Sequence, residues 1–194
     1  MFARLLAAFC LFNLAVALGQ SGSGLVVYLR TDPATPTRPI EQMKRELTPM
    51  LAAAGYQMEW TSGRVETSSA LVVVNLHGTP DTSNSLAATA ISEDGVLPFI
   101  TVNCGNLAHL LAPSLLTEAG ARRDFLYGRA LARVLAHELY HVLANTREHA
   151  RDGVAKPRFT AADLLAERFD LQPASVIRME AVSSISSNEA PSGR

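Results

Sequence analysis

The segment around residues 137–141 has the residue types and the spacing of a catalytic metal site. His137 and His141 are four residues apart, and Glu138 follows the first of them, which makes an HExxH pattern. Residues four apart lie on the same face of a helix, so both imidazoles can bind one metal ion. Glu138 then lies beside the ion, where a general base for the attacking water belongs. The pattern predicts zinc (Zn2+) as the cofactor and Glu138 as the catalytic residue.

A catalytic zinc site needs three protein ligands and an open fourth position. His149 is the third ligand that we favour. In a continuous helix, His149 would lie about 18 Å along the axis from His137, which is out of reach. The assignment therefore requires that the helix ends and that the chain turns back. Asn145 suits such an end, because asparagine tolerates the left-handed backbone conformation that closes a helix.

Carboxylates are the alternatives for the third ligand. Glu167 is the strongest of them, because it lies in a second helical pattern at 161–169. Glu148 and Asp152 are closer to the motif along the chain. A simpler interpretation also stays open, in which two partly exposed histidines and a solvated glutamate share an amphipathic helix.

The elements that would position this site follow from the hydrophobic pattern. Short apolar, β-branched runs predict strands, and apolar residues at helical spacing predict helices. The expected strands are 25–30, 56–60, 70–76, 86–91 and 97–103, and the expected helices are 40–54, 107–111, 124–144 and 161–169. Thr160 and Asp163 have the spacing of a helix-starting cap. This order predicts an α+β fold with one mixed β-sheet packed against helices, including the active-site helix.

Composition and the two ends of the chain limit the remaining possibilities. The chain has 194 residues, 48% of them hydrophobic, and a net charge of -1, so no basic excess exists for binding nucleic acid. Residues 1–19 have the layout of a signal peptide, which predicts a secreted or periplasmic protein without a stable membrane span after cleavage. Residues 20–182 would then form a single domain, and the serine-rich residues 183–194 a disordered tail.

The stretch 137–153, HELYHVLANTREHARDG, resembles the zinc site of metzincin-type metallopeptidases. The resemblance is strongest to small exported bacterial proteins in which a third histidine follows HExxH after an extended turn. It implies an exported zinc metallopeptidase that hydrolyses peptide bonds with a zinc-activated water and Glu138 as general base. The substrate would be a protein or peptide. Its extended backbone would pair with the strands at 86–103 that line the cleft.

The stretch also departs from the usual metzincin pattern. Ala144 stands where the turn glycine is expected, Arg147 where the third histidine is expected, and Ala155 where a turn methionine would follow. These differences keep two alternatives open on the same scaffold. One is a non-catalytic zinc-binding or structural protein, and the other is a peptidase with Glu167 as third ligand. An envelope interaction module with an accidental motif is a third possibility.

Overall fold

The computed structural model describes residues 22–32, 35–64, 70–80, 82–169 and 171–188. The predicted signal peptide at 1–19 lies outside these residues. Along the chain the elements are β1 (Ser23–Thr31), α1 (Thr37–Ala52), β2 (Tyr56–Thr61), β3 (Ala70–His77), β4 (Ala87–Ile91), β5 (Val96–Asn103), α2 (Cys104–Leu115), α3 (Gly120–Leu143), α4 (Ala161–Leu165) and α5 (Pro173–Asn188). Within the described residues, we find no helix with the length and apolar character needed to cross a bilayer.

The five strands form one mixed sheet in the order β2-β1-β3-β5-β4. Strands β2, β1, β3 and β5 run parallel, and β4 pairs antiparallel with β5. The β4–β5 hairpin turns at Gly95, whose φ of 147° is a conformation that glycine adopts without strain. The antiparallel strand β4 therefore forms one edge of the sheet.

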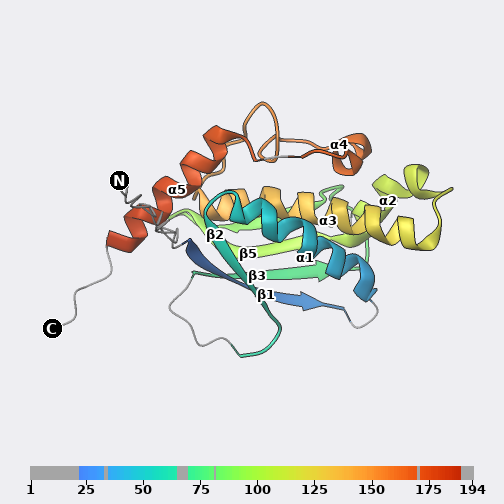
Figure 1. Ribbon diagram of the computed structural model, residues 1–194, viewed down its shortest axis with the longest axis horizontal. Coiled ribbons are helices and arrows are strands. Elements are labelled where there is room, and N and C mark those ends of the chain that lie inside the picture. Colours follow the sequence, from blue (N-terminus) through green and yellow to red (C-terminus); the bar gives the residue numbers. More distant parts are fainter. Residues whose placement is uncertain (1–21, 33–34, 65–69, 81, 170, 189–194) are drawn as a thin grey trace, which may run out of the picture.

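The helices cover one face of this sheet, with α1 and α3 side by side across it (Figure 1). Gly128 on α3 allows the two helices to approach closely, because a Cβ there would lie 2.5 Å from the carbonyl oxygen of Pro39. The core between the sheet and the helices is built from aliphatic side chains of all three, including Val27, Met43 and Leu135. The predicted α+β fold with a mixed sheet is confirmed, and the packing places α3 above the strands, close to β4 and β5.

Two predicted boundaries are wrong. The helix expected at 161–169 ends at Leu165, because Ala166 has an extended backbone and its carbonyl accepts hydrogen bonds from Arg129 and Arg133. The disordered tail expected from residue 183 is also incorrect at its start, since α5 continues through Asn188. This helix is held to the sheet at Met179, whose side chain is fully buried and whose carbonyl accepts from the Tyr56 hydroxyl at 3.0 Å.

The capping box of α4 is confirmed and gives a stability prediction. Thr160 and Asp163 cap each other's backbone, and Lys156 Nζ lies 2.6 Å from Asp163 Oδ1. Partial burial would raise the pKa of Asp163, but the hydrogen bonds from Lys156 and Thr160 outweigh it and lower this pKa from 3.8 to about 2. The carboxylate therefore contributes stability above about pH 4, and this contribution is lost as the pH falls towards 2.

We expect Asp163→Ala to lower the free energy of unfolding of the metal-free protein by about 1 kcal/mol at neutral pH. Urea unfolding at a series of pH values measures this difference. The difference in unfolding free energy between the wild type and the variant should become smaller as the pH falls from 4 to 2. A gap that stays constant over this range would show that the charge of Asp163 does not contribute.

Candidate metal centre

Helix α3 brings the HExxH residues to one place beneath the loop that follows it. His137, Glu138 and His141 are all buried, with only 7–8% of each residue exposed. Burial of three titratable groups within about one turn of a helix is costly unless they have partners. The hydrogen-bond partners of these three side chains therefore show how each one is oriented and which of its atoms stay free to bind a ligand.

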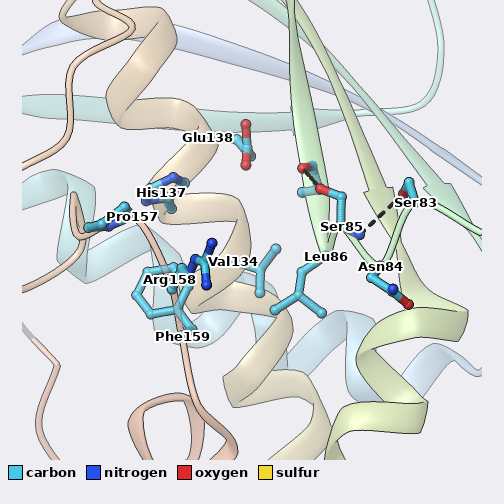
Figure 2. Close-up of a pocket in the computed structure, with 11 residues that line it drawn as sticks. Ser83, Asn84, Ser85, Leu86, Val134, His137, Glu138, Pro157, Arg158 and Phe159 are labelled. Carbon is cyan, nitrogen blue, oxygen red and sulfur yellow. Dashed lines mark hydrogen bonds between the residues drawn. The ribbon is translucent and has the colours of Figure 1, made fainter.

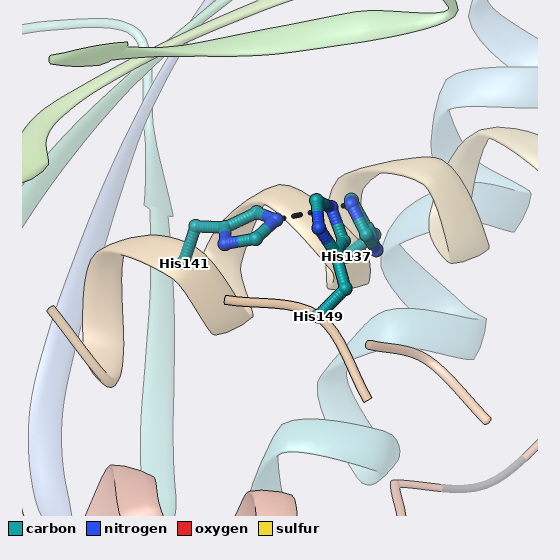
Figure 3. A group of neighbouring side chains, drawn as sticks. All are labelled: His137, His141 and His149. Carbon is teal, nitrogen blue, oxygen red and sulfur yellow. Dashed lines mark hydrogen bonds between the residues drawn. The ribbon is translucent and has the colours of Figure 1, made fainter. Parts of the chain in front are cut away.

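The chain leaves α3 through a helix-closing turn centred on Asn145. Asn145 has a φ of 40°, as its predicted role in ending the helix requires. The amide of Thr146 donates to the His141 carbonyl at 3.1 Å and the amide of Asn145 to Val142 at 3.2 Å, which is the Schellman pattern. The chain then reverses, so His149 returns to the face of α3 that carries His137 and His141 instead of continuing along the helix axis (Figure 3).

Backbone carbonyls fix the orientation of the two buried imidazoles. His137 Nδ1 lies 2.7 Å from the Val154 carbonyl, and His141 Nδ1 lies 2.8 Å from the Thr146 carbonyl. A carbonyl only accepts, so each Nδ1 carries the proton and each Nε2 presents a lone pair. The two Nε2 atoms face each other at 3.1 Å. Two lone pairs at this distance repel each other unless a cation lies between them.

The third imidazole completes the cluster. One ligand atom from each of His137, His141 and His149 lies within 4.8 Å of the others. The His149 ring is stacked on His137 with centroids 5.2 Å apart and meets His141 edge-on at 4.8 Å. A tetrahedral zinc with Zn–N bonds of about 2.0–2.1 Å separates its nitrogens by about 3.3 Å, close to the observed Nε2–Nε2 distance. Three neutral imidazoles are also a donor set that zinc prefers.

Burial favours the neutral form of two of these imidazoles, and neutral imidazole is the form that can bind a metal. Desolvation lowers the pKa of His137 to about 4, although its hydrogen bond to Val154 acts in the opposite direction. Desolvation, followed by the charge of His141, also lowers the pKa of His149. Neutral imidazoles need no proton release before they bind zinc, so the arrangement fits a metal near neutral pH.

The carboxylates considered as third ligands lie elsewhere. Glu148 is turned towards α5, where it pairs with Arg178 at 2.8 Å. Glu167 lines a separate cleft with Glu46 and Arg133. Asp152 is exposed and does not join the histidines. Among the described residues, the three histidines are the only group of His, Cys, Asp and Glu with the spacing to hold a metal ion.

Glu138 lies next to His137 on the side of α3 that faces β4. Its Oε2 accepts a hydrogen bond of 2.6 Å from the Thr89 hydroxyl. Desolvation raises the pKa of Glu138, and the Thr89 hydrogen bond opposes this by favouring the ionised form. No sequence pattern points to Thr89, because it is 49 positions from Glu138 and only the packing of the edge strand on α3 brings the two residues together.

A cleft of about 480 Å³ opens next to His137 and Glu138 (Figure 2). One wall comes from the segment that leads into β4, with Ser85 and Leu86. The opposite wall comes from the segment before α4, with Pro157, Arg158 and Phe159. The ring of Phe159 meets that of His137 edge-on, with centroids 5.3 Å apart. The candidate metal centre therefore borders an open groove between the edge of the sheet and the loop after α3.

The loop after α3 is also fastened to the β4–β5 hairpin. Asn145 Oδ1 accepts from the Val96 amide at 3.0 Å, and Arg147 Nη2 donates to the Ser92 carbonyl at 2.6 Å. Arg147 occupies the position where the metzincin pattern expects the third histidine, and here it is directed to the hairpin. His149, two residues later, is the residue that joins His137 and His141.

Comparisons with known proteins place this geometry in context. No family model matches the chain, and no curated protein does. The crystal structure of archaemetzincin from Methanopyrus kandleri is similar to it, with a TM-score of 0.52 and 10% sequence identity, over 87% of this chain and 99% of that one. The chain has an archaemetzincin-like fold. The metzincin resemblance inferred from residues 137–153 is thereby confirmed at the level of the fold.

Proposed function

We propose that this protein is a zinc-dependent metallopeptidase with His137, His141 and His149 as zinc ligands and Glu138 as general base. The observation that carries the proposal is the convergence of three imidazoles, two of them held by backbone carbonyls so that unprotonated Nε2 atoms face each other. The archaemetzincin-like fold supports it, because it places this cluster beside a groove at a sheet edge.

The chemistry follows from the positions of the side chains. A zinc ion held by the three imidazoles would supply the Lewis acidity that polarises a scissile carbonyl and acidifies a water molecule. Glu138 takes the proton of the attacking water and passes it to the leaving amine. Its burial raises its pKa and makes it a stronger base than a solvated carboxylate, while Thr89 keeps it oriented.

Strand β4 offers a means of binding an extended peptide. Ala87–Ile91 pairs with β5 on one side only, and β4 is the last strand in the sheet order. An extended substrate can add to such an edge through main-chain hydrogen bonds. Since Thr89 on this strand contacts Glu138, a peptide paired with β4 would pass close to the general base.

Elemental analysis and peptide digestion together test the proposed function. We expect the purified protein to hold one zinc per chain and to cleave members of a broad peptide library, with loss of cleavage after chelation and recovery with zinc. Bound zinc without cleavage of any peptide would favour the non-catalytic zinc-binding alternative, which the departures at Ala144, Arg147 and Ala155 motivate. The absence of both zinc and cleavage would favour an accidental motif.

Export is a further part of the proposal. We propose that residues 1–19 direct the chain out of the cytoplasm and are removed, so that the peptidase acts as a secreted or periplasmic enzyme. N-terminal sequencing of the protein recovered from the extracytoplasmic fraction tests this, with a start at residue 20 as the expected result. A chain retained in the cytoplasm with an intact N-terminus would contradict it.

Thr89→Val tests the support of the general base. The valine has a similar shape but cannot donate to Glu138, so we expect kcat/KM at neutral pH to fall about tenfold. Loss of the hydrogen bond raises the pKa of Glu138 further, which moves the acidic limb of the pH–rate profile to higher pH. Thr89→Ser keeps the hydroxyl, so its kcat/KM and its pH–rate profile should stay close to those of the wild type. An unshifted profile in Thr89→Val would show that the hydrogen bond has no catalytic role.

A further inference from the structure

The cleft beside the candidate metal centre contains a cation that the proposed reaction does not use. Of the residues that line it, only Glu138 and Arg158 carry a formal charge at neutral pH. The rest of the lining is polar on the side of Ser85 and apolar around Leu86, Val134 and Phe159 (Figure 2). Arg158 therefore sets the charge of the wall opposite the edge strand.

Arg158 has no acidic partner within the described part of the chain. It is exposed, and none of the ion pairs formed there includes it. Its neighbour Lys156 is paired with Asp163 instead. Two other arginines have acidic partners, since Arg129 pairs with Glu46 and Arg178 with Glu148. The Arg158 guanidinium thus lines the cleft and pairs with no carboxylate of the residues that the structure describes.

The segment that carries Arg158 is held on both sides. On one side, the Val154 carbonyl accepts from His137, and on the other Thr160 starts α4 through its capping box. Phe159 packs edge-on against the His137 ring, and Lys156 lies over the Phe159 ring at 5.4 Å. These contacts fix the backbone of Arg158 relative to the candidate ligand His137. A group bound by Arg158 would therefore lie in the cleft that His137 also lines.

We propose that Arg158 binds a carboxylate of the substrate close to the scissile bond. This inference rests on the proposed function and specifies its substrate class. A guanidinium pairs with a carboxylate through two parallel hydrogen bonds, a geometry that an amide or a hydroxyl does not match. Leu86, Val134 and Phe159 provide apolar surface for the methylene groups that precede the carboxylate. Two sources supply this chemistry: an Asp or Glu side chain, and the free C-terminus of a peptide.

The effect on binding should be moderate, because Arg158 is exposed. We expect a substrate carboxylate to improve affinity about fivefold over the neutral amide. The ion pair forms in the bound substrate and in the transition state alike, so the gain should appear in KM more than in kcat.

Peptide binding to zinc-loaded Glu138→Gln protein measures the preference without cleavage. In the peptide series, a single Glu or Gln is placed at each position of an otherwise neutral, fluorescently labelled sequence. Each peptide is made with a free and with an amidated C-terminus. Affinities from fluorescence anisotropy are compared in the Arg158→Ala and Arg158→Glu backgrounds. Arg168→Glu is the matched control, because Arg168 is exposed and lines a different cleft. Circular dichroism and zinc content verify that each variant is folded.

We expect peptides with Glu at one position, or peptides with a free C-terminus, to bind about fivefold more tightly than the matching Gln or amidated peptides. The preference should disappear in Arg158→Ala, reverse in Arg158→Glu and persist in Arg168→Glu. The amidated series shows which source supplies the carboxylate. Equal affinity for charged and neutral peptides, or a preference that survives Arg158→Glu, would overturn the inference. Cleavage by the wild type is measured separately. Arg158-dependent binding without cleavage would contradict the proposed peptidase activity but not the role of Arg158 in binding a carboxylate.

Discussion

Replacing His149 by Ala is expected to weaken zinc binding more than about 100-fold. Partners that only orient metal ligands already contribute about 10–100-fold to metal affinity, so loss of a direct ligand should exceed that range. His137 and His141 would remain oriented by the Val154 and Thr146 carbonyls, but two imidazoles alone leave zinc with too few protein ligands for a stable site. Competition with a chromophoric chelator measures the change.

Two controls make the result specific. His109→Ala removes an exposed imidazole from α2, outside the cluster, and should leave zinc affinity unchanged. Glu167→Ala removes the carboxylate that the sequence left as the main alternative, and it should also have no effect, because Glu167 lines a different cleft. Unchanged affinity in His149→Ala together with loss in Glu167→Ala would reverse the ligand assignment.

Glu138→Gln is expected to lower kcat for peptide cleavage by about 10²–10⁴-fold while zinc affinity stays the same. Proton transfer by a positioned base contributes a factor of this size, and glutamine cannot accept the proton. The amide has the shape of the carboxylate, and its oxygen can still accept from the Thr89 hydroxyl, so the site should keep its structure. Initial rates at saturating substrate, measured beside zinc content, separate loss of chemistry from loss of metal.

Glu59→Gln provides the matched control for this substitution. Glu59 is on β2, at the opposite edge of the sheet from β4, and its replacement should leave cleavage unchanged. A Glu138→Gln enzyme that cleaves at the wild-type rate with zinc bound would show that another group transfers the proton.

The local parts of this site could be predicted from the sequence. HExxH within an amphipathic helical pattern placed His137 and His141 on one face, and Asn145 indicated where the helix ends, because both features depend on residues close together in the chain. The same reasoning required a chain reversal for His149 to reach the cluster, and the structure shows that reversal.

The parts that depend on distant packing could not be predicted. Thr89 approaches Glu138 only because β4 forms the sheet edge beside α3, and the carbonyl of Val154 reaches His137 only after the loop has turned back. The helix assigned to 161–169 was too long because its hydrophobic pattern continues past Leu165. The helix ends where the Ala166 carbonyl accepts hydrogen bonds from Arg129 and Arg133. Both arginines belong to α3, so the sequence near residue 166 does not reveal these contacts.

X-ray absorption at the zinc edge of the loaded protein tests the central assignment most directly. The arrangement of His137, His141 and His149 predicts one zinc per chain with three imidazole nitrogens at about 2.0–2.1 Å and one further light atom from solvent. The spectrum should lose one imidazole contribution in His149→Ala. A wild-type spectrum with only two imidazoles and a protein carboxylate, or a protein that takes up no stoichiometric zinc, would contradict the account.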